Sequence, residues 1–217
     1  ALRLGAIYTI GPYLLPHLIP RLAARAPKMP LVIEENYTAS LAEKLKRGEL
    51  DVILISLPFV EPGVSTLPLY REPFVLLLPS SHPLNQKPEF AVADLKQEDV
   101  LLLGAGHCFR DQVLEVCPDC MHRSTSEVSP MQTLEGGSLE TIRYMVASGL
   151  GVTILPCSAA GADRFSERLL SIRRFDHDAP SRVVALAWRK SFPRPQAIKV
   201  LHDAVVGCEM SCVEPVH

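Results

Sequence analysis

The sequence predicts an α/β fold, in which helices cover a largely parallel sheet. Apolar strand-like runs alternate with segments of helical spacing near the start of the chain, which gives the order βαβαβ. The composition agrees with this class, because 47% of the 217 residues are hydrophobic and 21% are charged. Such a chain is able to bury the core of one or two domains.

The first strand and helix are bounded by clear breaking residues. Residues 2–7 alternate like a strand, and Gly11 and Pro12 interrupt that pattern. Residues 13–26 carry apolar side chains at helical spacing, and the helix stops before Pro27.

The next three elements complete the βαβαβ order. Residues 31–35 form a second strand, and residues 41–47 form a helix for which Ser40 is the expected N-cap and Gly48 the expected C-cap. Residues 50–55 are apolar enough for a strand that is buried in a parallel sheet.

The rest of the chain continues in the same style. Apolar runs predict strands at residues 72–78, 100–103, 152–155 and 183–188. Helical spacing predicts helices that begin at Phe109, at Ser138 and near Gln196. Ser138 and Thr141 are both plausible caps near the start of the second of these helices, which Gly149 and Gly151 end.

A cysteine segment just past a predicted buried strand carries the strongest chemical pattern. Cys108 stands beside His107, Arg110 and Asp111, and Cys117 follows nine residues on. Nearby cations favour the reactive thiolate, and a thiolate that oxidises to a sulfenic acid condenses with a second thiol. Ligand sites in open α/β sheets lie at the carboxyl ends of strands, so this position agrees with the chemistry. The segment therefore predicts a redox switch.

The spacing of the two cysteines suggests how such a switch works. If Cys108 and Cys117 lie on one helix, they stand about 13 Å apart along its axis and on opposite faces. A disulfide needs Cα atoms about 4.4–6.8 Å apart. We hypothesise that oxidation unwinds the helix locally and that this refolding is the signal.

Other kinds of site receive less support. Cys117 and Cys120 form a C-x-x-C, but a structural zinc site needs four ligands, and only His122 is an obvious third. Cys157, Cys208 and Cys212 lie in no charged cluster. The sequence has no dinucleotide fingerprint, no P-loop and no nucleophile elbow, so we expect neither cofactor nor metal.

Charge and hydropathy exclude two further classes. The net charge of −2 gives no basic surface for an autonomous nucleic-acid binder. The longest weakly charged stretch, residues 145–162, is broken by glycine and proline, so no membrane span is expected. The chain opens at Ala1 without a methionine, and we expect it to be a fragment whose N-terminal part is absent.

Several motifs together resemble a known family of regulators. Residues 138–156, the Leu14-Leu15-Pro16 run and residues 48–54 look like the effector domain of the LysR-type regulators. Residues 106–112 with Cys117 are similar to the peroxide-sensing OxyR branch of that family.

The resemblance implies a periplasmic-binding-protein-like fold of two Rossmann-like subdomains. Residues 1–76 and 190–217 would form subdomain I, and residues 77–189 would form subdomain II with the redox cysteines. The DNA-binding winged helix-turn-helix of full-length relatives is absent from this chain. The loop after Cys117 is longer than the family pattern and brings Cys120.

The resemblance also implies the roles of individual residues. Cys108 would react with hydrogen peroxide and Cys117 would resolve it, with Cys120 as an alternative resolving thiol. The residues around the peroxide would be Thr9, Thr38, His107, Arg110, Asp111 and Arg189.

The implied function is that of a cytoplasmic regulator, not an enzyme. It would be a homodimer or homotetramer that binds DNA through the absent N-terminal domain and, as an activator, contacts RNA polymerase. Two alternatives stay open at this point. One is a LysR-type domain that binds a small-molecule co-inducer between its subdomains, and the other is slow peroxidase turnover.

Overall fold

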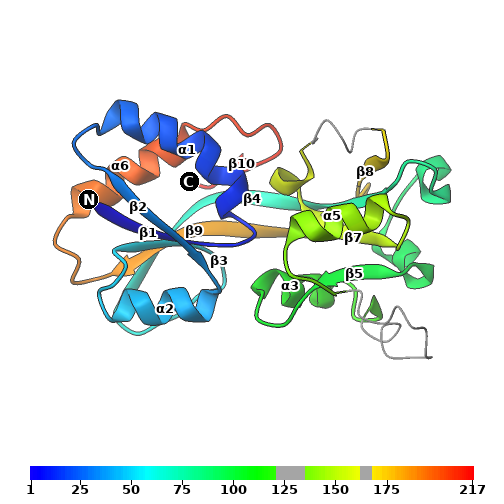
Figure 1. Ribbon diagram of the computed structural model, residues 1–217, viewed down its shortest axis with the longest axis horizontal. Helices are drawn as coiled ribbons and strands as arrows, with labels where there is room; N and C mark the ends of the chain where they lie inside the picture. Colours follow the sequence, from blue (N-terminus) through cyan, green and yellow to red (C-terminus); the bar gives the residue numbers. More distant parts are fainter. Residues whose placement is uncertain (121–134, 162–167) are drawn as a thin grey trace. The chain divides into compact units, whose positions relative to one another are not determined.

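The chain divides into two compact α/β units. A computed structural model describes residues 1–120, 135–161 and 168–217. Unit 1 consists of Ala1–Glu72 and Arg182–His217, and unit 2 consists of Pro73–Ser181 (Figure 1). The predicted fold class, α/β with two subdomains, is confirmed.

Both boundaries between the units differ from the sequence-based ones. The prediction places residues 183–188 in subdomain II, whereas the structure places strand β9 (Ser181–Arg189) mostly in unit 1. The reason is strand pairing: β9 runs antiparallel to β3 (Val52–Ser56), with Trp188 opposite Val52 and Val184 opposite Ser56.

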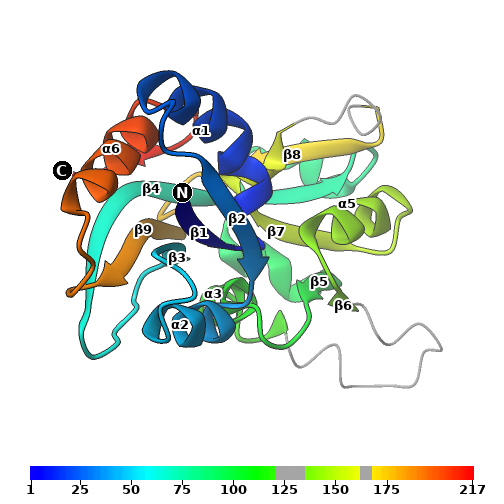
Figure 2. The same ribbon diagram turned by 60° about the vertical axis from the view of Figure 1, so that its left-hand side comes forward.

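Unit 1 is a sheet covered by helices on both faces. Strand β1 (Leu2–Ile7) lies between β2 (Leu31–Asn36) and β3, and both pairings are parallel. Helices α1 (Gly11–Arg25) and α6 (Pro195–Val206) pack together on one face. Helix α2 (Thr38–Lys46) covers the other face against β1 and β3 (Figures 1 and 2).

Unit 2 combines antiparallel and parallel strands. The second half of β4 (Val64–Pro79) pairs antiparallel with β7 (Val152–Pro156) and with β8 (Leu170–Arg174). Strand β7 then runs parallel to β5 (Val100–Leu103), which pairs with the short β6 (Glu135–Gly136). Among the described residues of this unit, the longer helices are α3 (Cys108–Val116) and α5 (Leu139–Ala147), and both contact β5.

Short elements complete the described part of the chain. They are the 3₁₀ helices η1 (Pro83–Gln86), η2 (Val92–Gln97) and η3 (Cys157–Ala160), and the strand β10 (Glu214–Pro215). Strand β10 runs antiparallel to the first half of β4, with Glu214 opposite Arg71.

Helix ends test the capping predictions. Ser138 caps α5 as expected, because its side chain accepts a hydrogen bond from the Thr141 N–H at 3.1 Å. The prediction of Ser40 as a cap is wrong, since α2 begins two residues earlier at Thr38. The N-cap is Tyr37, whose N–H donates to the side-chain oxygen of Asn36 at 2.9 Å, and Ser40 lies inside the first turn of the helix.

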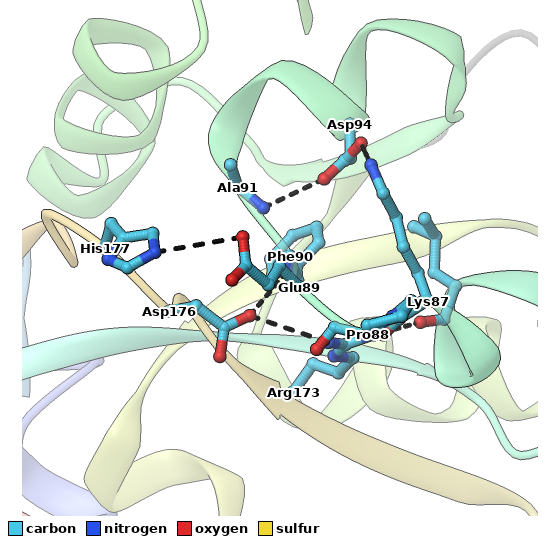
Figure 3. A network of polar contacts seen from close by, with 10 residues as sticks. Lys87, Pro88, Glu89, Phe90, Ala91, Asp94, Arg173, Asp176 and His177 are labelled. Carbon is cyan, nitrogen blue, oxygen red and sulfur yellow. Dashed lines mark hydrogen bonds and ion pairs between the residues drawn. The ribbon is translucent and has the colours of Figure 1, made fainter.

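Strand β8 has no counterpart in the predicted elements. It mixes arginines with apolar residues, and Ile172 is 48% exposed, so its sequence lacks a continuous apolar run. Polar contacts hold the segment before β5 against this strand (Figure 3). Arg173 donates to the main-chain oxygens of Leu84 and Lys87, and Asp176 accepts the Phe90 N–H.

A buried ion pair joins the two chain segments that make up unit 1. Glu72 is the last residue of the first segment and Arg182 is the first residue of the second. Their side chains are fully buried, with Nη2 of Arg182 3.4 Å from Oε1 of Glu72. Arg182 also donates to the hydroxyl of Thr9 at 2.7 Å and to its carbonyl at 2.9 Å.

Replacing Glu72 should therefore destabilise the protein strongly. Glu72→Gln leaves the Arg182 charge buried without its counter-ion, and we expect a loss of about 3 kcal/mol in the free energy of unfolding. Urea denaturation measures this loss. The control is Glu43→Gln, which removes an exposed pair with Lys46 and should leave the urea midpoint unchanged. Equal midpoints for the two variants would contradict the role given to the buried pair.

Candidate redox site

The turn before α3 places Cys108 at the start of a helix. The chain leaves β5 at Leu103 and reaches the helix through Gly106, whose φ of +99° suits glycine and few other residues. His107 is the N-cap, with extended backbone angles. Cys108 is then the first residue of α3, half-buried and with a free thiol. The predicted position at the carboxyl end of a strand agrees with this geometry.

Aromatic packing anchors the first turn of α3. Phe109 is 2% exposed, and the edge of its ring meets the ring of Phe74 on β4 with 5.0 Å between centroids. One turn later Val113 is 3% exposed. These residues give the nine-residue helix one apolar face, and that face points into the core of unit 2.

Arg110 ties the helix back to the strand that precedes it. Its Nη1 donates a hydrogen bond of 2.7 Å to the carbonyl of Leu103, the last residue of β5. Asp111 is exposed in the first turn of α3, where a negative charge interacts favourably with the helix dipole. The predicted neighbours of Cys108 thus lie on its own helix, and Arg110 contributes to the position of that helix.

His107 is buried at the helix start. Burial lowers the pKa of His107 below its usual range, and a hydrogen bond with the backbone of Gly137 acts in the opposite direction. The imidazole is therefore neutral at pH 7 and supplies no fixed positive charge to the Cys108 thiol. This environment suits a positioning role for His107.

The other end of α3 carries two further cysteines. Cys117 is the C-cap residue and is 3% exposed, and Cys120 is 5% exposed. Their sulfurs are joined in a disulfide with 5.5 Å between the Cα atoms. The structure therefore pairs Cys117 with Cys120, while α3 remains intact between Cys117 and the free Cys108.

The remaining predicted site residues belong to unit 1. The hydroxyl of Thr9 accepts a hydrogen bond from Arg182, and Thr9 is 3% exposed. Arg189 donates to the carbonyls of Leu45 and, at 2.8 Å, of Leu50, so it holds the end of α2. Its role beside a peroxide stays a prediction.

Thr38 has a side-chain hydroxyl without a hydrogen-bond partner among the described residues. It is the first residue of α2, a helix whose N-terminal N–H groups donate no hydrogen bond to a capping side chain. The Oγ1 of this hydroxyl is also buried. A peroxide pocket formed by Thr9, Thr38 and Cys108 stays a prediction.

Sequence reasoning missed the contribution of Arg182 and Glu72. Each stands at or next to the end of an apolar run in the sequence, where a charged residue is normally solvated. Local sequence gives no sign that the two meet, because 110 residues separate them.

A metal site and a membrane-spanning helix are both absent from the described residues. Among residues 1–120, 135–161 and 168–217, no group of three or more histidine, cysteine or acidic residues is arranged to hold a metal. His122, the third ligand considered for zinc, lies outside the described residues. Over the same ranges, every helix is too short or too polar to cross a membrane.

Comparison with known sequences identifies the family of the chain. The model of the LysR substrate binding domain matches residues 1–207. A probable hydrogen peroxide-inducible genes activator from Streptomyces viridosporus is 38% identical over 204 residues, covering 94% of this chain and 64% of the relative. The DNA-binding transcriptional dual regulator OxyR from Escherichia coli K12 is 33% identical over 210 residues, covering 94% and 65%. The chain thus spans just under two thirds of these relatives.

Solved structures agree over nearly the whole chain. A reduced form of OxyR from N. meningitidis superimposes with a TM-score of 0.92 at 42% identity, covering 100% of this chain and 99% of that one. The reduced OxyR regulatory domain from Pseudomonas aeruginosa gives a TM-score of 0.85 at 53% identity, covering 95% and 97%. The chain therefore belongs to the LysR substrate-binding domain family and, within it, to the OxyR regulatory domains.

Proposed function

We propose that this chain is the peroxide-sensing regulatory domain of a DNA-binding transcriptional regulator. The observation that carries the proposal is a free thiol at Cys108, at the start of a helix whose far end holds Cys117. The names of the relatives, which are peroxide-inducible activators and OxyR proteins, support the same reading.

The first chemical step is oxidation of Cys108. Its thiolate sulfur attacks one oxygen of hydrogen peroxide, the O–O bond breaks, and the leaving hydroxide takes up a proton to become water. The sulfur becomes a sulfenic acid. A helix N-terminus favours negative charge, so the position of Cys108 suits a thiolate nucleophile.

The second step is formation of the Cys108–Cys117 disulfide. In the reduced chain, in which Cys117 is not bonded to Cys120, the thiolate of Cys117 attacks the sulfenic sulfur, and the hydroxyl group leaves as water after protonation. In an intact α3 the two residues are about 13 Å apart along the axis, so the helix must unwind for the sulfurs to meet. That unwinding is the conformational change that a regulator is able to transmit.

The predicted pocket would position the peroxide during the first step. Thr9, Thr38, His107, Arg110, Asp111 and Arg189 are its proposed members. The buried and unpartnered Oγ1 of Thr38 supports this assignment, since it is a hydroxyl that a small polar ligand would satisfy.

The full-length protein would act as a homodimer or homotetramer in the cytoplasm. It would bind DNA through a segment outside this chain and, as an activator, contact RNA polymerase. Peroxide would act stoichiometrically, as a signal and not as a substrate that is turned over. A co-inducer domain with incidental cysteines is the competing function, and the response of Cys108 variants separates the two.

Cysteine variants test the proposed chemistry. We expect Cys108→Ser to lower the rate of reaction with one equivalent of peroxide by at least about 100-fold, because the nucleophile is lost. Cys117→Ser should keep the wild-type rate and accumulate a sulfenic acid at Cys108, which dimedone labelling and mass spectrometry detect.

A matched control is available in Cys208, the other free and half-buried cysteine. Burial raises the pKa of the Cys208 thiol, so little thiolate is present and Cys208→Ser should react like the wild type. A wild-type rate for Cys108→Ser would contradict the proposed function and favour the co-inducer domain.

The threonine pocket has its own test. Thr38→Val keeps the shape of the side chain and removes the hydroxyl that would bind peroxide, so we expect the rate of Cys108 oxidation to fall by about tenfold. Stopped-flow kinetics at several peroxide concentrations measures it. Thr141→Val, which removes an exposed hydroxyl near the start of α5, is the control and should leave the rate unchanged. Equal rates for the two variants would remove Thr38 from the pocket.

A further inference from the structure

We propose that Cys120 resets the switch by thiol–disulfide exchange. Its thiolate attacks the sulfur of Cys117 in the oxidised Cys108–Cys117 form, releases Cys108 as a free thiolate, and leaves a Cys117–Cys120 disulfide. This inference rests on the proposed function, because the exchange needs the Cys108–Cys117 disulfide as its starting point.

The pairing of the cysteines is the observation behind the proposal. Cys117 is bonded to Cys120, and at the same time Cys108 is free at the start of an unbroken α3. The Cys117–Cys120 disulfide is thus compatible with the helical form of the segment. By contrast, the Cys108–Cys117 disulfide is incompatible with that form, because the helix holds the two residues too far apart.

Local geometry explains how Cys117 serves both partners. Its N–H still donates to the carbonyl of Val113 at 2.9 Å, so Cys117 stays attached to the end of α3. A tight turn then brings Cys120 back, with the Cys120 N–H 3.1 Å from the Cys117 carbonyl. The two Cα atoms are 5.5 Å apart, inside the range that a disulfide needs.

The exchange balances without any outside reagent. One S–S bond breaks, between Cys108 and Cys117, and one forms, between Cys117 and Cys120. One thiolate is consumed and one is released, so the oxidation state of the protein as a whole does not change. The two-electron oxidation delivered by one molecule of peroxide thus passes from the Cys108–Cys117 pair to the Cys117–Cys120 pair.

The direction of the exchange follows from the conformations of the two forms. Both forms contain one disulfide in this segment, so their difference in free energy comes from the backbone conformation and the side-chain packing. The Cys108–Cys117 form loses the helix and with it the burial of Phe109 and Val113, whereas the Cys117–Cys120 form keeps both. The shorter loop between Cys117 and Cys120 also costs less closure entropy. Exchange toward Cys120 is therefore favourable.

The exchanged form would be refractory to a second signal. Cys108 is again able to react with peroxide, but its resolving partner is already bonded. The disulfide of Cys117 and Cys120 is buried, because Cys117 is only 3% exposed and Cys120 only 5% exposed. This burial slows reduction of the disulfide by external thiols. The domain would thus return to its helical state and stay there until the buried disulfide is reduced.

Disulfide mapping over time tests the exchange. The chain is fully reduced, treated with one equivalent of peroxide, quenched with an alkylating agent at intervals, and analysed by peptide mass spectrometry. We expect the Cys108–Cys117 disulfide first and the Cys117–Cys120 disulfide later, with first-order kinetics that do not depend on protein concentration. Cys120→Ser should lengthen the lifetime of the Cys108–Cys117 form at least about tenfold, and Cys208→Ser should not change it.

The outcomes separate this proposal from the one on which it rests. A Cys108–Cys117 disulfide that forms and persists equally in the wild type and in Cys120→Ser overturns the exchange and leaves the sensing function in place. Formation of Cys117–Cys120 at the wild-type rate in Cys108→Ser also overturns it, because the bond would then arise by direct oxidation. If Cys108 is not oxidised in any variant, the sensing function and the exchange both fail.

Discussion

The length of α3 is the constraint on which the rest of the candidate site depends. The helix holds Cys108 and Cys117 at opposite ends, about 13 Å apart along its axis, and a disulfide tolerates about half that separation. A reactive thiol and its partner therefore coexist in one segment without reacting in the folded state. Forming a disulfide between them requires the helix to unwind, so the free energy of unwinding is part of the cost of the reaction. The geometry of α3 therefore couples the chemistry to the conformation.

The anchors of α3 are unevenly distributed along it. Its first turn is held by the ring of Phe109 against Phe74 and by Arg110 at the end of β5. Beyond Val113 the residues of the helix are exposed or half-buried until Cys117. A helix that is fixed at its start and loosely packed near its end is suited to unwinding that begins on the Cys117 side, before the burial of Phe109 is lost.

The parts of this arrangement that local sequence determines were the parts that could be predicted. Apolar runs and breaking residues located most strands and helices, and the spacing of Cys108 and Cys117 predicted the geometric conflict on a helix. The hydrogen bond from Arg110 to Leu103, the burial of Glu72 with Arg182, and the placement of Arg189 at the end of α2 depend on tertiary packing. Ser40 failed as a cap because the helix begins at Thr38 after Tyr37, an N-cap residue without a capping side chain, which the sequence does not signal.

Three cysteines lie within thirteen residues, and which two of them form a disulfide depends on whether α3 is helical. When α3 is helical, Cys117 lies within reach of Cys120 alone, and when α3 unwinds it is also able to meet Cys108. The free energy that stabilises the helix, mostly the burial of Phe109 and Val113, is then also the free energy that favours one disulfide over the other. The apolar face of a short helix would in this way set both the threshold for the signal and its duration.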